Sequence, residues 1–276
     1  MIEQKPDTTN QTLTAEMAGQ NPNWAPWTAH QTFLAVLLTL IPWIAFSLML
    51  NTLGGNTPSN QPLTMAQDIT GAIVAFIFTA LIEGAFLIAP YYYVKKAVQS
   101  ASKAASVSVS TLCKTLGLRR FNLVRTLPWI IGLMVMIFAF DEIYTYAISV
   151  LHLHIMTNDQ VVLQQGKVAP LTTYGVLLGS IIIAPICEEL FFRGFVLPGL
   201  LHEMSPVWAV LISAALFATA HVDPGTFLPL FAIGIALGFV RLRSGSVWAS
   251  ISLHMLNNTL ASVIIVLALH GIALPF

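Results

Sequence analysis

Long apolar stretches separated by short polar segments make up most of the chain after about residue 30. A helix needs roughly 17–25 apolar residues to cross the hydrocarbon core of a bilayer. Seven stretches reach or approach that length, namely Phe33–Leu53, Ile69–Tyr92, Leu127–Leu151, Tyr174–Leu197, Val207–His221, Phe227–Val240 and Val247–Leu269. The pattern therefore predicts an all-α membrane bundle of about seven to eight transmembrane helices.

The fifth and sixth stretches are short for full membrane spans. Asp223-Pro224-Gly225 lies between them, and a sequence of this kind breaks a helix. We expect the two helices either to be tilted or to be the halves of a helical hairpin around this turn.

Composition supports the membrane assignment. The chain is 56% hydrophobic and only 9% charged, whereas soluble domains carry about 25% charged residues. Its formal net charge is zero, which argues against nucleic acid as a partner. The expected partner is the lipid bilayer, and the expected location is a cell membrane that the chain crosses several times.

Residues 1–30 are polar and predict a disordered cytoplasmic tail, whereas residues 31–276 predict one transmembrane domain. Trp24 and Trp27 are expected to sit at a membrane interface. Basic loop residues lie between the second and third helices (Lys95, Lys96, Lys103, Lys114, Arg119, Arg120 and Arg125) and between the sixth and seventh (Arg241 and Arg243). By the positive-inside rule, both loops and the N-terminus are expected on the cytoplasmic side.

Two adjacent acids and a cation interrupt the fourth apolar stretch. Ionisable groups within a membrane are costly, so they are functional candidates by default. Glu189 and Arg193 are four residues apart and share a helix face, whereas Glu188 is turned about 100° away. We expect Arg193 to neutralise Glu189 and to leave Glu188 free to act as a general base. The alternative is a buried ion-pair cluster that only stabilises the bundle.

Two further polar pairs follow at helical spacing. Phe217 and His221 end the fifth stretch, and His254 and Asn258 lie one turn apart in the last. A histidine at a helix end is often structural, and a histidine with an amide can simply form hydrogen bonds between helices. As functional groups, His254 and Asn258 could stabilise a developing oxyanion.

Together these groups predict a hydrolytic site. A water held between Glu188 and His221 could lose a proton as it attacks a peptide carbonyl, and His254 and Asn258 would bind the oxyanion. Glu188, His221 and His254 would also make a plausible three-ligand zinc site. No HExxH spacing supports that alternative. We therefore favour catalysis without a cofactor and leave dependence on a divalent metal such as zinc open.

Other acids in the apolar stretches offer a different function. Glu83 lies in the second stretch, and Asp141 and Glu142 lie in the third. Acids within a membrane serve as proton relays in pumps and transporters. A proton-coupled transporter is therefore a second, less favoured interpretation.

The three motifs resemble those of the CPBP family, which comprises CAAX proteases and bacteriocin-processing (Abi) proteins. The family signature is EExxxR, FxxxH and HxxxN, and its counterparts here are Glu188–Arg193, Phe217–His221 and His254–Asn258. The resemblance covers Tyr174–Ala261, within a motif-bearing core of residues 171–270. It implies a glutamic-type intramembrane endopeptidase whose catalytic cavity opens toward the cytosol. The short chain suggests a prokaryotic member.

The resemblance also implies roles for individual residues. By motif position, the catalytic residues would be Glu188, His221, His254 and Asn258, supported by Glu189, Arg193 and Phe217. The implied substrate is a peptide or a lipidated protein, such as a prenylated CAAX protein. Some prokaryotic members are linked to bacteriocin self-immunity, and others act as membrane scaffolds without known proteolysis. A non-proteolytic role of that kind is the alternative within the family.

Overall fold

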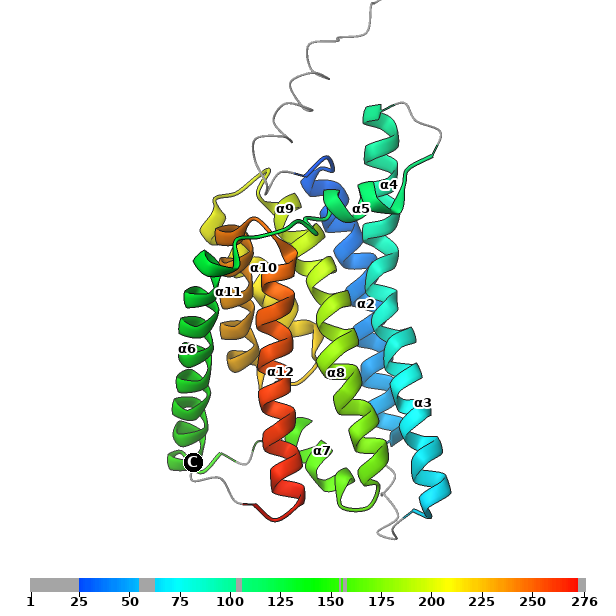
Figure 1. The fold of residues 1–276 in the computed structure, drawn as a ribbon, viewed down its shortest axis with the longest axis vertical. Coiled ribbons are helices and arrows are strands. Elements are labelled where there is room, and N and C mark those ends of the chain that lie inside the picture. Colours follow the sequence, from blue (N-terminus) through cyan, green and yellow to red (C-terminus); the bar gives the residue numbers. More distant parts are fainter. Residues whose placement is uncertain (1–24, 55–62, 103–105, 154, 156–157, 273–276) are drawn as a thin grey trace, which may run out of the picture.

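A computed structural model describes residues 25–54, 63–102, 106–153, 155 and 158–272. Every regular element in these ranges is a helix, and Figure 1 shows them as one elongated bundle. The elements are α2 (Ala29–Gly54), α3 (Met65–Gly84), the 3-10 turn η1 (Ala85–Leu87), α4 (Ile88–Ser102), α5 (Val109–Thr115), α6 (Leu123–Val150), α7 (Asn158–Gly166), α8 (Pro170–Phe191), the π-helix η2 (Phe192–Val196), α9 (Leu197–Leu200), α10 (Pro206–Ala220), α11 (Phe227–Ser244) and α12 (Val247–Leu269).

The expected helical membrane bundle is confirmed. Within the described residues, 6 helical stretches are long and apolar enough to cross a membrane: Ala29–Leu50, Met65–Ser100, Leu123–Val150, Pro170–Leu200, Phe227–Ser244 and Val247–Leu269. A seventh apolar helix, α10, has 15 residues, or about 22 Å at 1.5 Å per residue, which is short of a full span. α10 and α11 pack against each other around the turn at residues 221–226, as the hairpin alternative expected.

Small residues bring the helices of this hairpin close together. A Cβ atom added at Gly234 of α11 would lie 2.8 Å from the Cβ of Ala214 on α10. One turn later, a Cβ at Gly238 would lie 3.1 Å from a methyl group of Val210. Glycines four residues apart let two membrane helices approach closely, so this Gly-x-x-x-Gly pair fixes the position of α10.

Glycines four residues apart also allow α3 and α8 to pack closely together. A Cβ atom at Gly175 would lie 2.9 Å from the Cα of Ala72, and one at Gly179 would lie 2.9 Å from a methyl group of Thr79. The carboxylate of Asp68 then accepts hydrogen bonds from the first backbone N–H groups of α8. A carboxylate at a helix N-terminus satisfies donors that have no partner within the helix. α3 is therefore held firmly along the N-terminal half of α8.

The segment after α5 covers one end of the bundle. The backbone N–H of Val247, at the start of α12, donates to the carbonyl of Gly117 over 2.9 Å. The hydroxyl of Ser246 donates to the carbonyl of Arg119. This end also carries the loop basic residues, because α5 and the α11–α12 connection lie together at the top of Figure 1. Lys167, which follows α7, lies at the opposite end.

Most of the expected polar tail, residues 1–24, lies outside the described residues. The following residues belong to the packed structure. Trp27 is buried rather than placed at a membrane interface, because its ring stacks on Phe195 at 4.9 Å and its indole N–H donates to the carbonyl of Phe195 over 3.1 Å. The expectation for Trp27 is therefore wrong, and the one for Trp24 lies outside the described part of the chain.

Candidate functional site

The first motif lies where α8 changes its winding. Glu188 and Glu189 occupy the last turn of α8 and are 7% and 0% exposed. The π-helix η2 begins three residues after Glu189 and contains Arg193. Single π-turns inside α-helices occur frequently at functional sites. Gly194 allows the tight packing there, because a Cβ at this position would lie 2.9 Å from the carbonyl oxygen of Leu116.

Arg193 and Glu189 form the ion pair that the sequence predicted. The Nη1 of Arg193 lies 2.7 Å from Oε1 of Glu189, and both side chains are fully buried. The second guanidinium nitrogen of Arg193 donates to the carbonyl of Gly234 over 3.0 Å. The pair therefore ties the end of α8 to the middle of α11.

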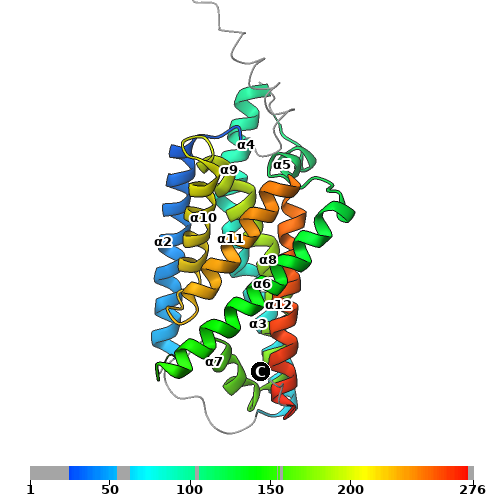
Figure 2. The ribbon, with the colours of Figure 1, turned by 90° about the vertical axis from the view of Figure 1, so that its left-hand side faces the viewer.

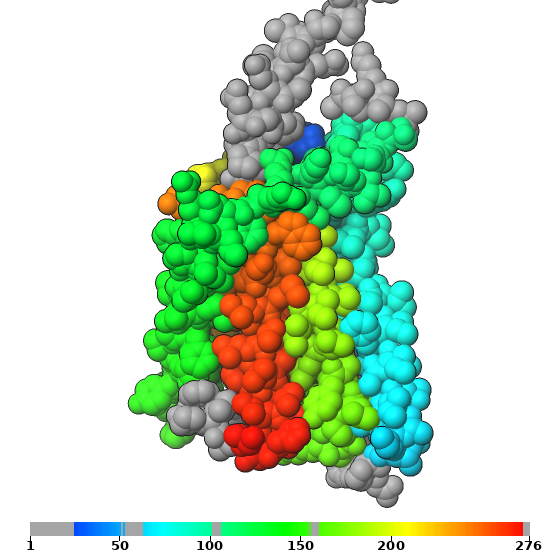
Figure 3. All heavy atoms as spheres, in the orientation of Figure 1, coloured from blue at the N-terminus to red at the C-terminus, as the bar shows by residue number. Residues whose placement is uncertain are grey.

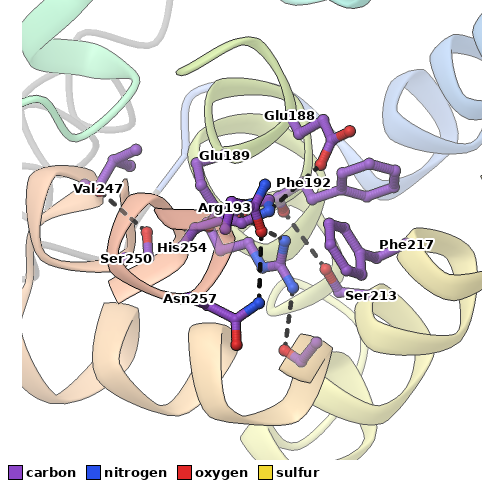
Figure 4. Close-up of polar contacts among 12 residues, drawn as sticks. Glu188, Glu189, Phe192, Arg193, Ser213, Phe217, Val247, Ser250, His254 and Asn257 are labelled. Atoms are coloured by element: carbon purple, nitrogen blue, oxygen red, sulfur yellow. Dashed lines mark hydrogen bonds and ion pairs between the residues drawn. The ribbon is translucent and has the colours of Figure 1, made fainter. Parts of the chain in front are cut away.

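Glu189 has a second partner that the sequence did not predict. The Nδ1 of His254 lies 3.1 Å from the same Oε1 atom of Glu189. Because a carboxylate oxygen only accepts, Nδ1 carries the hydrogen when both groups are engaged in this way. Glu189 therefore orients His254 as well as neutralising Arg193, and Figure 4 shows the three side chains together between α8 and α12.

Glu188 is not locked to Arg193. Its Oε2 atom is buried without a hydrogen-bond partner, and the nearest ion-pair contact of this atom is Nε2 of His254 at 3.8 Å. That distance is too long for a hydrogen bond. His254 thus lies between two carboxylates, with Nδ1 held by Glu189 and Nε2 turned toward Glu188 (Figure 4).

Phe217 is the centre around which the charged groups pack. Its ring lies 4.7 Å from the ring of His221 and 5.6 Å from that of His254. The guanidinium carbon of Arg193 lies 4.5 Å from the centre of the same ring. A cation over an aromatic face is attracted electrostatically and gains more where water is excluded. The spacing of the second motif thus places one aromatic ring against both histidines and the arginine.

His221 lies at the turn between α10 and α11, and its Nδ1 lies 2.9 Å from the carbonyl of Phe217. The turn itself is held from two sides. The indole of Trp43 on α2 donates to the carbonyl of Ala220, and the hydroxyl of Tyr144 on α6 donates to the carbonyl of Gly225, each over 2.6 Å. No local spacing links Trp43 or Tyr144 to the turn, so the sequence alone places neither residue there.

The turn between α10 and α11 also contains a strained backbone conformation. Val222, directly after His221, has a φ angle of 52°. A β-branched residue with positive φ is rare and costs on the order of 1–3 kcal/mol. Such strain persists only where the surroundings hold the backbone, and here Trp43 and Tyr144 do so.

Asn258 lies one turn beyond His254 on α12. Its amide nitrogen donates to the carbonyl of Ser180 on α8 over 2.9 Å. This is the interhelical contact that the structural alternative expected. A carboxamide has two N–H groups, so the contact with Ser180 does not use its whole donor capacity.

Glu188, His221, His254 and Asn258 line one cavity of about 390 Å³. Its polar lining also includes Glu83, Asp141, Asp223 and Asn257. The remaining wall is largely apolar and comes from α6, α8, α11 and α12, with Met134, Ile137, Leu177, Leu230 and Ile265 among its residues. A volume of this size is typical of ligand sites.

The cavity extends away from the basic end of the bundle. Leu177 on its wall precedes Glu188 on α8 by 11 residues, or about 16 Å along the helix axis. Ile265 follows His254 on α12 by the same interval. α6 and α12 both contribute to the cavity wall. Figures 1 and 2 show the course of these two helices, and Figure 3 shows the same face as Figure 1. The cavity thus reaches toward the end opposite the basic loops, while residues 116–119 pack over the basic end. With the basic loops on the cytoplasmic side, this direction differs from the opening toward the cytosol that the family resemblance implied.

A metal site does not emerge from these side chains. Among the described residues, no group of three or more His, Cys, Asp or Glu side chains has an arrangement suited to holding a metal ion. Glu188, His221 and His254 share the cavity without forming a ligand set. The arrangement instead offers a carboxylate whose Oε2 atom has no hydrogen-bond partner, two imidazoles and a carboxamide around one cavity.

Comparison with known proteins finds a family that matches part of the chain. Residues 170–260 match the model of the type II CAAX prenyl endopeptidase Rce1-like family. This segment is similar to that family. The resemblance seen in the motifs is thereby confirmed, and all three motifs lie within the matched residues.

A curated protein is similar to part of the chain. The protein described as "Putative membrane peptidase YdiL" of Bacillus subtilis (strain 168) is 30% identical over 102 residues, which is 37% of this chain. The matched part spans 40% of the length of that relative. No solved structure matches the chain. The family match and this relative support a membrane protease at the family level, and a prokaryotic origin fits this relative.

Proposed function

We propose that the protein is an intramembrane endopeptidase that hydrolyses a peptide bond of a membrane-associated or lipidated substrate. The observation that carries the proposal is the shared cavity of Glu188, His221, His254 and Asn258. Within that cavity the Glu188 carboxylate is not hydrogen-bonded to Arg193, which is bound to Glu189 instead. A free carboxylate beside donors for an oxyanion is the constellation that water-mediated hydrolysis requires.

The mechanism gives each group one role. Glu188 removes a proton from water as the water oxygen attacks the peptide carbonyl, and His221 helps to hold that water. Nε2 of His254 and the amide of Asn258 donate to the oxyanion that develops on the carbonyl. Phe217, Glu189 and Arg193 hold these groups in place.

Donation by His254 depends on the charge balance of the site. Nδ1 already faces Glu189, so a hydrogen on Nε2 as well requires the imidazolium form. Glu188 and Glu189 then oppose Arg193 and His254, and the four buried side chains carry no net charge. Buried charges are tolerated when they are paired and hydrogen-bonded, so this balanced state suits the binding of substrate.

We expect the reaction to proceed without a metal. The support is the side-chain arrangement, in which the described acids and histidines form no ligand set. Full activity should therefore remain after dialysis against EDTA and 1,10-phenanthroline. Loss of activity on chelation, restored by Zn²⁺ or Mn²⁺, would instead show that the substrate-bound site recruits a metal.

The substrate class follows from the cavity wall. Apart from the polar groups, the cavity is lined mostly by apolar residues. The substrate is therefore expected to place apolar side chains or a lipid chain against them. A proton-coupled transporter is not favoured by a specific observation. Glu83 and Asp141 lie on the same cavity wall as the hydrolytic groups, and Glu142 is not part of that wall.

We place the N-terminus and the basic loops on the cytoplasmic side of a cell membrane, in accordance with the positive-inside rule. Lys95→Cys and Lys167→Cys, each in a chain with Cys113→Ser, provide the test. A membrane-impermeant maleimide added to intact cells should label Lys167→Cys and not Lys95→Cys. The reverse labelling would invert the topology.

The activity is tested with purified protein in lipid vesicles. A library of apolar peptides, with and without a prenyl group, is incubated with the protein, and products are identified by mass spectrometry. Endoproteolytic products that disappear with Glu188→Gln and with His254→Gln would support the proposal. A protein that cleaves no peptide but copurifies with a membrane partner regardless of Glu188→Gln would instead be a scaffold.

A further inference from the structure

A half-buried acid outside the family-matched segment lies on the cavity wall. Glu83 is at the end of α3, next to Gly84 and the 3-10 turn η1. Its Oε2 atom is buried without a hydrogen-bond partner. Glu188, on the facing helix α8, lines the same cavity and has the same unsatisfied Oε2 atom. A buried polar atom without a partner requires an explanation, such as a catalytic role or a water.

The packing of α3 on α8 holds this carboxyl group in place. Gly175 and Gly179 of α8 lie against Ala72 and Thr79 of α3, with no room for a larger side chain. Glu83 lies one helical turn beyond Thr79 on α3. Its carboxyl group is therefore carried on a rigid element, as precise chemistry requires.

The two acids share one cavity, and no cation among the described residues is hydrogen-bonded to either of their Oε2 atoms. Arg193 is hydrogen-bonded to Glu189 instead. The other titratable or charged groups that face them are Cys187, Glu189 and Arg193 on α8 and η2, His254 on α12, Asp141 on α6, and His221 and Asp223 at the α10–α11 turn. Two ionised carboxylates in one cavity of low dielectric repel, so such a pair is most stable when it holds a single proton.

We propose that Glu83 and Glu188 hold one proton between them and that Glu83 gives this proton to the leaving amine during hydrolysis. The inference rests on the proposed peptidase function. It makes Glu83 the proton donor of the reaction and Glu188 the proton acceptor. Paired carboxyl groups with unequal roles are a general solution for acid–base chemistry near neutral pH.

The proton balance of the cycle is complete without a further reactant. Before reaction, Glu83 is protonated and Glu188 is ionised. Glu188 takes one proton from water as the new C–O bond forms, and Glu83 gives its proton to the peptide nitrogen as the C–N bond breaks. The proton on Glu188 then passes through cavity water to Glu83. The products are one carboxylic acid and one amine, and both acids return to their initial states.

The kinetic test compares Glu83→Gln, Glu83→Asp and Glu142→Gln. Glu142 is the matched control, because it is an acid of α6 that does not line the cavity. Removal of a general acid typically costs about 10²–10⁴-fold, so we expect Glu83→Gln to lower kcat by about 10²-fold or more with KM nearly unchanged. Glu83→Asp should recover at least part of the lost kcat, and Glu142→Gln should match the wild type.

A second measurement does not depend on turnover. A protonated carboxyl group absorbs in the infrared apart from carboxylates, so the shared proton can be counted in the wild-type protein at pH 7. We expect one such band to disappear with Glu83→Gln and also with Glu188→Gln, because either change leaves a single carboxylate. The band should remain with Glu142→Gln.

The outcomes separate this inference from the proposed function. If the wild type cleaves peptides and Glu188→Gln does not, but Glu83→Gln keeps the wild-type kcat, the peptidase stands and the role of Glu83 is refuted. A protonated-carboxyl band that survives Glu83→Gln also refutes it. If Glu83→Gln is misfolded, the comparison of Glu83→Asp with the wild type decides the kinetic question. A wild-type protein that cleaves no peptide overturns both proposals.

Discussion

At the scale of single residues, two adjacent acids have opposite surroundings. Glu189 bonds to Arg193 and His254, whereas Glu188 has a buried oxygen without a hydrogen-bond partner. Removing one partner of a buried ion pair leaves the other uncompensated, at a cost of about 3–5 kcal/mol. We therefore expect Glu189→Gln to lower the melting temperature in detergent strongly and Glu188→Gln to leave it nearly unchanged. Differential scanning fluorimetry of both variants measures this. Equal destabilisation by the two substitutions would mean that the acids form one structural cluster.

At the scale of helices, glycines allow the helices that carry the site to pack closely together. A Cβ at Gly175 would press on the backbone of Ala72, while one at Gly132 of α6 meets no atom within 4 Å. Overpacking of a tight contact costs about 1–3 kcal/mol. Gly175→Val should therefore lower the melting temperature and separate α3 from α8, and Gly132→Val is the control that should not. If both variants melt like the wild type, the α3–α8 contact is looser than described.

The sequence predicted best the contacts between residues that are close together along the chain. The pairing of Glu189 with Arg193 follows from four-residue spacing on one helix, and hydropathy alone indicated the apolar helices. The Glu189–His254 bond could not be predicted, because it joins residues 65 positions apart. The end of the fourth apolar helix was also not predicted from the sequence, because α8 continues through η2 and α9 to Leu200 rather than ending near Leu197.

At the scale of the whole molecule, the cavity joins the polar groups to an apolar space between α6, α8 and α12. Ala261 of α12 lines this space, whereas Leu256 on the same helix is 46% exposed and does not. Ala261→Trp should fill the cavity and lower kcat/KM by at least about tenfold, the equivalent of 1.4 kcal/mol. Leu256→Trp should have little effect, because its side chain faces outward. The assay is peptide hydrolysis in vesicles, and unchanged kcat/KM in Ala261→Trp would show that substrate does not use this space.

The central claim is that Glu188 activates water for hydrolysis of a peptide bond. The most direct measurement is kcat/KM of Glu188→Gln for a peptide that the wild type cleaves, with Glu142→Gln as the control. The account predicts a loss of about 10²–10⁴-fold for Glu188→Gln in a protein that melts like the wild type, and no loss for Glu142→Gln. Cleavage by Glu188→Gln at the wild-type rate would contradict it.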